Sequence, residues 1–247
     1  MQTNIEPIGR IIWSADVADE VTLMGHLDRM PELRIVKIDR LFLTGIDLWL
    51  ITRLREKGFC VFVDAKIIEI PSKVVAIAGR YLQHKPWMLN CMAGAQSSGL
   101  LTHEDPEKID GLKRFADACH AAGTRPCAVT VLTSKTDEVV SREFNERTSI
   151  DQVLYYVEML LECGFTDVVC SPKELPAIRA ESLFDSLDLN TQGIRPAGSD
   201  AGDQARADTP EAALAAGATR LVIGRPITTG DPAENLRNIV AGITAAA

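Results

Sequence analysis

The sequence predicts an α/β protein, a (β/α)8 TIM barrel, from three observations. Eight short apolar runs rich in β-branched residues alternate with longer amphipathic segments, as expected for strands buried on both faces. Eight such units in 247 residues amount to about 31 residues each, the usual size of a strand–helix unit. No linker divides the chain, so we expect one domain over residues 1–247. A doubly wound open sheet is the alternative, but no G-x-G-x-x-G turn follows the first strand.

The predicted strands are the short apolar runs. In order, they are residues 11–16, 34–38, 59–64, 87–91, 127–132, 167–170, 184–189 and 220–224. The seventh run differs from the others because it contains two aspartates. Between the strands, residues 47–57, 107–122 and 150–163 are predicted helices, and each is followed by a glycine, a common C-terminal cap. Thr209 and Pro210 open another helix, as N-cap and first-turn residue.

The longest irregular segment is 190–208, which is rich in Gly, Pro and Asp. A loop of this length in a compact domain is usually functional or disordered. It follows the seventh strand, where phosphate-binding loops gather in such barrels. It is therefore a candidate lid over a bound ligand.

The overall composition argues against several classes of protein. Lys plus Arg is 26 and Asp plus Glu is 34, so the net charge is 26 − 34 = −8, which argues against a nucleic-acid-binding protein. No apolar run reaches the roughly 18 residues needed to span a membrane, and no signal-peptide pattern is visible. The six cysteines form no C-x-x-C pair, which predicts free, buried thiols and a cytoplasmic location. The four histidines lack ligand spacing, so we expect no metal site.

Charged residues gather at the end of the third predicted strand. Asp64 and Lys66 are two residues apart, so on a strand they point to the same side, and Lys37 lies on the neighbouring strand. We expect an alternating Lys–Asp–Lys array at the barrel mouth, with Glu69 just beyond it. Such an array can donate a proton and stabilise negative charge. The alternative is a structural salt-bridge network at the rim.

A second group of residues suits a phosphate. Gly224 lets backbone N–H groups approach closely after the eighth strand, and Arg225 can bind phosphate oxygens in a bidentate way. Arg195 and Gln204, in the loop after the seventh strand, either close over a ligand or are simply solvated. The alternative for Arg225 is a salt bridge on a rim loop.

Five segments resemble elements of the orotidine 5'-phosphate decarboxylase family, and they occur in the family's order. Residues 64–71 (DAKIIEIP) resemble D-x-K-x-x-D-I-P, residues 129–134 resemble V-T-x-L-T-S, residues 193–196 resemble G-I-R-P, residues 203–206 resemble D-Q-x-R, and residues 222–228 resemble V-[IV]-G-R-P-I-T. The likeness spans about residues 10 to 235. Five ordered elements identify the chain as a member of this superfamily.

The resemblance implies the chemistry of the site. The reaction would be the cofactor-independent decarboxylation of orotidine 5'-phosphate to uridine 5'-phosphate, a step of pyrimidine biosynthesis, with no metal and no organic cofactor. Lys66 would give a proton to C6 of the pyrimidine, Asp64 would lie near the departing carboxylate, and Lys37 would hold Asp64 and a ribose hydroxyl. Glu69 would reach across a homodimer into the partner's site.

The resemblance also implies which residues bind the substrate. Asp16 would bind the ribose, and Thr133 and Ser134 would contact the pyrimidine ring or its loop. The 5'-phosphate would be bound by Arg195, Gln204, Gly224 and Arg225.

The chain departs from the family pattern in three places. Glu69 replaces the usual Asp, and Ser72 and Lys73 stand where Asn and Thr are usual. Glu69 and Lys73 are four residues apart, so they can pair with each other if this turn is helical. Gln192 stands where a Pro usually precedes Gly, and the fourth strand ends at residues 90–92 without the His often found there.

Two alternative functions stay open. The first is a related barrel lyase that acts on another nucleotide or on a sugar phosphate, with a carboxylate on the second strand as a magnesium ligand. Lys37 favours the decarboxylase, although Asp39 is close by. The second is a catalytically impaired homologue that binds a phosphate ligand through Arg225 and Gln204 and has lost turnover through Glu69.

Overall fold

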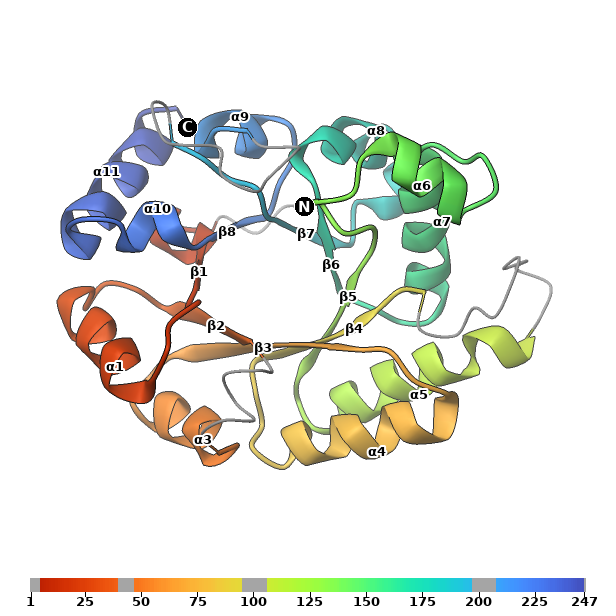
Figure 1. Cartoon of the computed structure of the whole chain (residues 1–247), viewed down its shortest axis with the longest axis horizontal. Coiled ribbons are helices and arrows are strands. Elements are labelled where there is room, and N and C mark those ends of the chain that lie inside the picture. Colours follow the sequence, from red (N-terminus) through yellow and green to blue (C-terminus); the bar gives the residue numbers. More distant parts are fainter. Residues whose placement is uncertain (1–4, 40–46, 95–105, 197–207, 247) are drawn as a thin grey trace.

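The computed structural model describes residues 5–39, 47–94, 106–196 and 208–246. Within them, eight parallel strands close into a barrel in sequence order, with β8 pairing with β1 (Figure 1). The strands are β1 Ile11–Ser14, β2 Ile35–Asp39, β3 Cys60–Ile67, β4 Met88–Met92, β5 Arg125–Val129, β6 Asp167–Cys170, β7 Asp188–Thr191 and β8 Arg220–Ile223. The predicted fold class, the TIM barrel, is confirmed.

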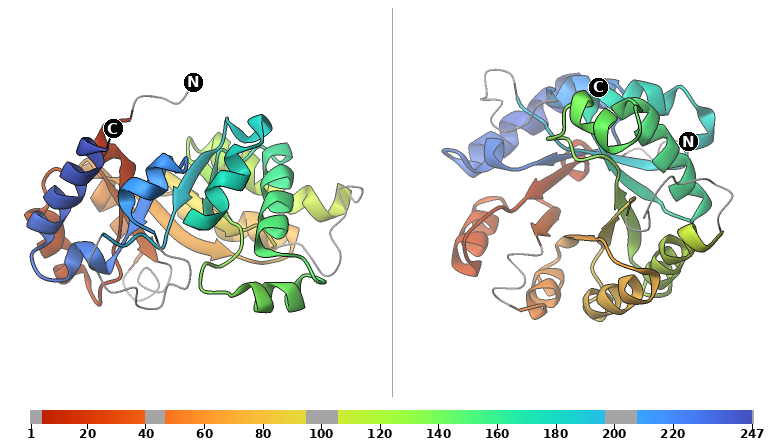
Figure 2. Two further views of the ribbon diagram at one scale, coloured as in Figure 1. Left: turned by 90° about the horizontal axis from the view of Figure 1, so that it is seen from above. Right: turned by 45° about the vertical axis from the view of Figure 1, so that its right-hand side comes forward.

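Helices surround the barrel, and Figure 1 and the right-hand view of Figure 2 show them outside the strands. They are α1 Glu20–Arg29, α3 Trp49–Glu56, α4 Pro71–Leu82, α5 Pro106–Ala121, α6 Asp137–Glu143, α7 Ser149–Glu162, α8 Leu175–Arg179, α9 Pro210–Ala215, α10 Arg225–Thr228 and α11 Pro232–Ala245. Short 3-10 helices cover Pro7–Arg10, Pro172–Glu174 and Ser182–Phe184.

The predicted helix ends are confirmed. Gly58, Gly123 and Gly164 follow α3, α5 and α7 with φ of 93°, 71° and 83°, the left-handed conformation that glycine adopts without strain. Thr209 caps α9, where its hydroxyl accepts a hydrogen bond from the backbone N–H of Ala212, and Pro210 occupies the first turn.

The core has two parts because side chains alternate along each strand. Outward-facing residues such as Trp13, Val36 and Val63 pack against the helices. Inward-facing residues fill the barrel: Ile12, Ile35, Phe62, Met88, Cys127, Val129, Val169 and Val222. All six cysteines are free and five of them are buried, while Cys60 is partly exposed, so the predicted free thiols are confirmed.

The strand boundaries differ most from the predictions in β7, β5 and β3. The seventh strand was expected at 184–189, but Ser182–Phe184 forms a 3-10 helix and β7 begins at Asp188. The backbone N–H of Leu187 bonds to the carbonyl of Phe184, which keeps this segment out of the sheet. β5 ends at Val129 because it pairs with β6 only through Cys127–Val129, and β3 continues beyond Asp64 to Ile67.

Candidate active site

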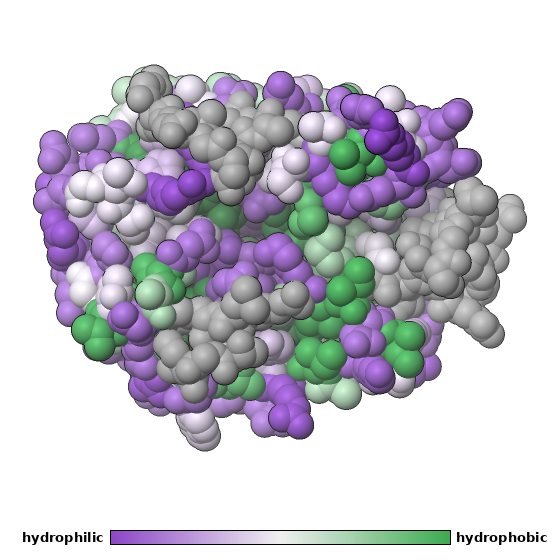
Figure 3. Space-filling view, viewed as in Figure 1, coloured by the Kyte–Doolittle hydropathy of each residue, from purple (hydrophilic) through white to green (hydrophobic). Residues whose placement is uncertain are grey.

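A polar cavity of about 240 Å³ opens at the carboxyl ends of the strands. Figure 3 shows hydrophilic side chains around a hollow near the middle of this face. The lining residues come from both sides of the barrel: Ser14, Asp16, Lys37, Asp39, Asp64, Lys66, Gln192, Gly193, Arg195, Val222, Gly224 and Arg225. This is the end of a TIM barrel where active sites lie.

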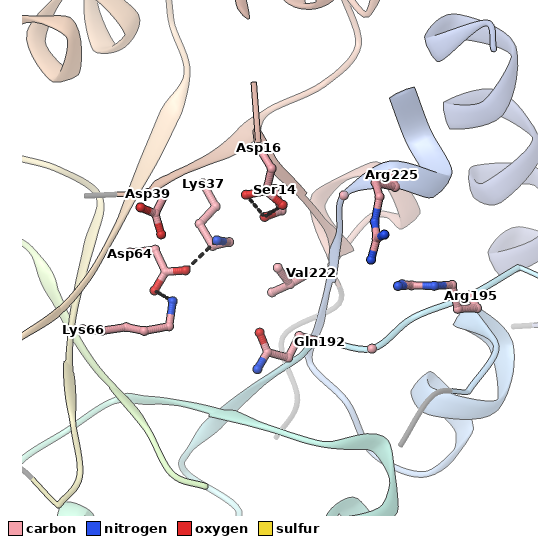
Figure 4. Close-up of a pocket in the computed structure, with 12 residues that line it drawn as sticks. Ser14, Asp16, Lys37, Asp39, Asp64, Lys66, Gln192, Arg195, Val222 and Arg225 are labelled. Carbon is pink, nitrogen blue, oxygen red and sulfur yellow. Dashed lines mark hydrogen bonds and ion pairs between the residues drawn. The ribbon is translucent and has the colours of Figure 1, made fainter. Parts of the chain in front are cut away.

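One wall of the cavity is the Lys–Asp–Lys array. Lys37 Nζ lies 2.5 Å from one carboxylate oxygen of Asp64, and Lys66 Nζ lies 2.6 Å from the other. Lys37 and Asp64 are buried, with 8% and 4% of their surface exposed, while Lys66 is more accessible. Both ammonium groups therefore contact the same carboxylate at the edge of the cavity (Figure 4).

Burial and ion pairing shift the pKa values of Lys37 and Asp64 in opposite directions. Burial alone would lower the pKa of Lys37, but the adjacent Asp64 carboxylate outweighs it and the pKa is raised. Burial alone would raise the pKa of Asp64, but the ammonium groups of Lys37 and Lys66 outweigh it and hold that pKa well below its usual range. Lys37 and Asp64 are therefore both charged at neutral pH.

Lys66 reaches Asp64 through an irregular piece of strand. The pairing of β3 with β4 shifts between Val63 and Ile67, and Lys66 has a φ of 44°, which is unusual for a residue other than glycine. Simple alternation along a regular strand predicts that Lys66 lies on the same side as Asp64. The two side chains do meet, but a bulge brings them together.

The opposite wall carries two guanidinium groups. Arg195 and Arg225 both point into the cavity, from the segment after β7 and from the end of β8 (Figure 4). The backbone N–H of Arg195 bonds to the carbonyl of Asp208 at 2.8 Å, which fixes the start of this segment. A Cβ atom at Gly224 would lie 3.3 Å from a carboxylate oxygen of Asp16, so glycine permits a close approach there. Asp16 also accepts a hydrogen bond from the hydroxyl of Ser14 at 3.3 Å.

Four residues named from the sequence lie away from the cavity or outside the described residues. Thr133 is buried and contacts the site indirectly, because its hydroxyl accepts a hydrogen bond from Gln192 Nε2 at 3.1 Å. Ser134 is exposed and is not among the lining residues. Glu69 lies between β3 and α4 and does not line the cavity of its own chain. Gln204 lies outside the described residues.

The conditional pairing of Glu69 with Lys73 is not observed. Helix α4 begins at Pro71, so Glu69 precedes the helix and the spacing of four residues does not bring the two side chains together. Among the described residues, no ion pair joins them.

Besides Ser14, which lines the cavity at the end of β1, sequence reasoning missed two polar residues of the site. Asn90 is fully buried under the array, where its amide contacts both Asp64 and the backbone of Lys66. Gln192 follows β7 directly and lines the cavity. A polar residue inside the apolar run 87–91 was the available signal for Asn90. Gln192 was missed because the seventh strand was expected to end at residue 189. The strand in fact ends at Thr191, which makes Gln192 the first residue after it.

Comparison with known proteins decides the family. The sequence model described as the Orotidine 5'-phosphate decarboxylase / HUMPS family matches residues 9–239. The chain belongs to this family. The resemblance drawn from five short segments is therefore confirmed, and it extends over most of the chain.

Relatives within the family are similar along nearly their whole length. The orotidine 5'-phosphate decarboxylase of Haemophilus influenzae is 35% identical over 236 residues, which cover 95% of this chain and 98% of that protein. The one from Actinobacillus succinogenes is 35% identical over 237 residues, covering 95% and 97%. The crystal structure of orotidine 5'-phosphate decarboxylase from Lactobacillus acidophilus superposes with a TM-score of 0.77 at 26% identity, covering 94% and 98%.

The alternative lyase considered from the sequence would use a carboxylate on the second strand as a magnesium ligand, so the metal-binding capacity of the site matters. In the described part of the chain, no three His, Cys, Asp or Glu side chains are placed to hold a metal ion. Two carboxylate residues that line the cavity, Asp39 and Asp64, are register partners on β2 and β3. Both oxygens of Asp64 already contact ammonium groups. Within the described ranges, no helix is long and apolar enough to cross a membrane.

Proposed function

We propose that this protein decarboxylates orotidine 5'-phosphate to uridine 5'-phosphate without a cofactor, as a carboxy-lyase of pyrimidine biosynthesis. The single observation that carries the proposal is the arrangement of the cavity. Two ammonium groups flank one ionised carboxylate on one wall, and two guanidinium groups lie on the other. The first wall suits a reaction that develops negative charge, and the second suits a phosphate.

The phosphate end supplies binding energy at a distance from the reacting carbon. Arg225 and Arg195 bind phosphate oxygens through their guanidinium groups, and Gly224 lets the backbone approach closely. Gln204 is a further predicted phosphate ligand. Interactions with a remote phosphate hold the pyrimidine ring in place against the Lys–Asp–Lys array.

The pyrimidine end carries out the reaction. The bond between C6 and the carboxylate breaks, carbon dioxide leaves, and the electron pair stays on C6. The ammonium of Lys66 stabilises the resulting carbanion and then transfers a proton to C6, after which Lys66 regains a proton from solvent. Asp64 lies beside the departing carboxylate and holds Lys66 and Lys37 in place. Because Asp64 is already ionised and paired, the charges are arranged before the substrate binds.

The remaining predicted contacts hold the ribose and the ring. Asp16 lines the cavity near Gly224, which supports its predicted role of binding ribose hydroxyls together with Lys37. Gln192 lines the floor between the two walls and is held by Thr133. Thr133 therefore acts on the ring through Gln192, and a ring contact for Ser134 stays a prediction.

The loss of orotidine 5'-phosphate absorbance without added metal tests this function directly. We expect turnover by the wild-type protein, and a drop in kcat of roughly 1,000-fold or more in Lys66→Ala, because the proton donor and the stabilising charge are lost together. Lys57→Ala is the matched control, since Lys57 is exposed at the end of α3 and away from the cavity. Equal rates for the two variants would contradict the role of Lys66.

The same assay distinguishes the alternatives. The second candidate is a magnesium-dependent lyase that acts on a sugar phosphate. It is favoured by Asp39, a carboxylate on β2 that is the register partner of Asp64 on β3. Turnover of a sugar phosphate only with added magnesium would support that lyase. Tight binding of uridine 5'-phosphate with no turnover of either substrate would support the binding protein that lost activity through Glu69.

We also propose a homodimer with shared active sites. Glu69 does not line its own cavity, and its neighbours Ile68 and Ile70 are each 58% exposed, which is unusual for isoleucine and suits a surface covered by a partner. A twofold dimer would bring Glu69 of each subunit to the other subunit's site. A cytoplasmic location and a single domain over residues 1–247 stay predictions, the former supported by the free thiols.

Mixing two inactive variants tests the shared site. Lys66→Ala and Glu69→Ala homodimers are combined after mild dissociation, so that half of the dimers are mixed. Each mixed dimer then has one site with both wild-type residues, and we expect about a quarter of the wild-type activity per subunit to return. Mixed dimers without regained activity would contradict a site shared between subunits, as would a monomer in sedimentation.

A further inference from the structure

The irregular pairing of β3 with β4 leaves a backbone group beside the array in need of a partner. Val63 pairs with Leu89 and Ile67 pairs with Cys91, so a longer piece of β3 lies opposite a shorter piece of β4. A bulge of this kind breaks the regular ladder of hydrogen bonds. The backbone N–H of Lys66 donates instead to Asn90 Oδ1 at 2.8 Å. Asn90 is the β4 residue directly opposite the bulge.

The other end of the same amide contacts the catalytic carboxylate. Asn90 Nδ2 donates to Asp64 Oδ1 at 2.8 Å, and the same oxygen lies 2.6 Å from Lys66 Nζ. The contacts form a closed ring from the backbone of Lys66 through Asn90 to Asp64 and back through the Lys66 ammonium. Asn90 is 0% exposed, so water does not substitute for either hydrogen bond. The side-chain amide of Asn90 supplies both the acceptor and the donor that this arrangement needs.

We propose that Asn90 is a positioning residue that holds Lys66 in its left-handed backbone conformation and directs its ammonium toward the reacting carbon. A lysine at φ 44° persists only where its surroundings hold it there. Without Asn90, the N–H of Lys66 and one oxygen of Asp64 both lose a buried partner, and the bulge is free to relax. This inference rests on the proposed decarboxylation.

A second buried asparagine provides the control. Asn190 on β7 is also 0% exposed, and its Nδ2 donates to Asp167 at 3.0 Å, but it does not line the cavity. Asn90→Ala and Asn190→Ala should lower Tm by similar amounts, since each removes a buried amide bonded to a carboxylate. Only Asn90→Ala should lower kcat, by roughly 100-fold, as expected for a displacement of about 1 Å at the reacting atom. KM should change little in both, because Arg195 and Arg225 are untouched.

Asn90→Asp gives a second readout through its pH profile. When protonated, the introduced carboxyl reproduces both contacts, accepting from the Lys66 N–H and donating to Asp64. When ionised, it repels Asp64 and donates nothing. The ratio of the variant's kcat to the wild-type kcat should therefore fall as pH rises. Leucine has a similar shape to asparagine but neither donates nor accepts a hydrogen bond. For Asn90→Leu, the ratio of the variant's kcat to the wild-type kcat should therefore not change with pH.

The outcomes separate this inference from the proposed function. Wild-type turnover of orotidine 5'-phosphate establishes the function by itself, and its absence overturns both. With turnover established, a kcat in Asn90→Ala no lower than that in Asn190→Ala overturns the positioning role. A pH-independent ratio for Asn90→Asp overturns it as well.

Discussion

Asp64 is the residue on which the electrostatics of the site depend. It is buried, and each of its oxygens lies within 2.6 Å of an ammonium nitrogen. Such a carboxylate is stable only while both partners are present, since removing one leaves charge buried and uncompensated. A second buried carboxylate, Asp167, shows the opposite balance, because burial raises its pKa despite the nearby Arg125. The two aspartates therefore affect stability in opposite directions as pH changes.

The acid dependence of stability should separate these two residues. The pKa of Asp64 is lower in the folded chain than its unfolded value near 4, so its contribution is present above about pH 4 and is lost as pH falls. The pKa of Asp167 is raised, so its contribution is present at low pH and is lost as pH rises. We expect the urea midpoint of unfolding to fall as pH is lowered from about 5 to about 3. This fall should be smaller in Asp64→Asn than in the wild type, and larger in Asp167→Asn. Changes of the same sign in both variants would contradict these assignments.

At the scale of elements, one arginine supports the turn that precedes the seventh strand. Arg179, at the end of α8, donates to the carbonyls of Phe184 and Leu187 at 3.2 Å each. It also donates to the carbonyl of Gly217 at 3.0 Å, next to the start of β8. These bonds hold residues 184–187 as a turn before β7, although their apolar character favours a strand.

Removing this arginine should destabilise the barrel. Arg179→Ala leaves several carbonyls without their donor, so we expect a loss of about 2–3 kcal/mol in the free energy of unfolding. Arg142→Ala is the matched control, because among the residues that the structure describes Arg142 pairs only with Glu138, and the two side chains are 76% and 73% exposed. The control should stay within about 0.5 kcal/mol of wild type. Urea unfolding measures both, and an equal loss in the two variants would contradict the role given to Arg179.

At the scale of the whole molecule, the site spans the barrel. The Lys–Asp–Lys array lies on β2 and β3, while Arg195 and Arg225 follow β7 and β8 (Figure 4). Neither wall is a complete site, and closure of the barrel sets the distance between them. The substrate would bridge the walls, so binding at one wall would position the reaction at the other.

Substrates with and without phosphate test this division. Arg225→Ala should lower kcat/KM for orotidine 5'-phosphate by roughly 10- to 100-fold, since hydrogen bonds between charged groups contribute about 1.5–3 kcal/mol. With orotidine, which lacks the phosphate, the variant and the wild type should have equal kcat/KM. A loss of the same size with both substrates would show that Arg225 acts on the structure of the site instead of on the phosphate.

The sequence by itself determined the features that depend on neighbours along the chain. The eight strands, the glycine caps and the capping of α9 follow from local periodicity and turn chemistry, and the structure bears them out. The meeting of Lys37, Asp64 and Lys66 also followed from alternation and strand order, as did the assignment of a family. These patterns lie in short stretches of sequence or in the order of the strands along the chain, so they can be read without the fold.

Only the tertiary structure decided the features that depend on distant segments. The left-handed conformation of Lys66 and the contacts of Asn90 arise where β3 and β4 pair, 24 residues apart along the chain. The start of β7 depends on Arg179, and the place of Glu69 outside its own cavity depends on where α4 begins. The physical reason is that a hydrogen bond between distant strands can override local preference. No local pattern records which atoms the closed barrel brings together.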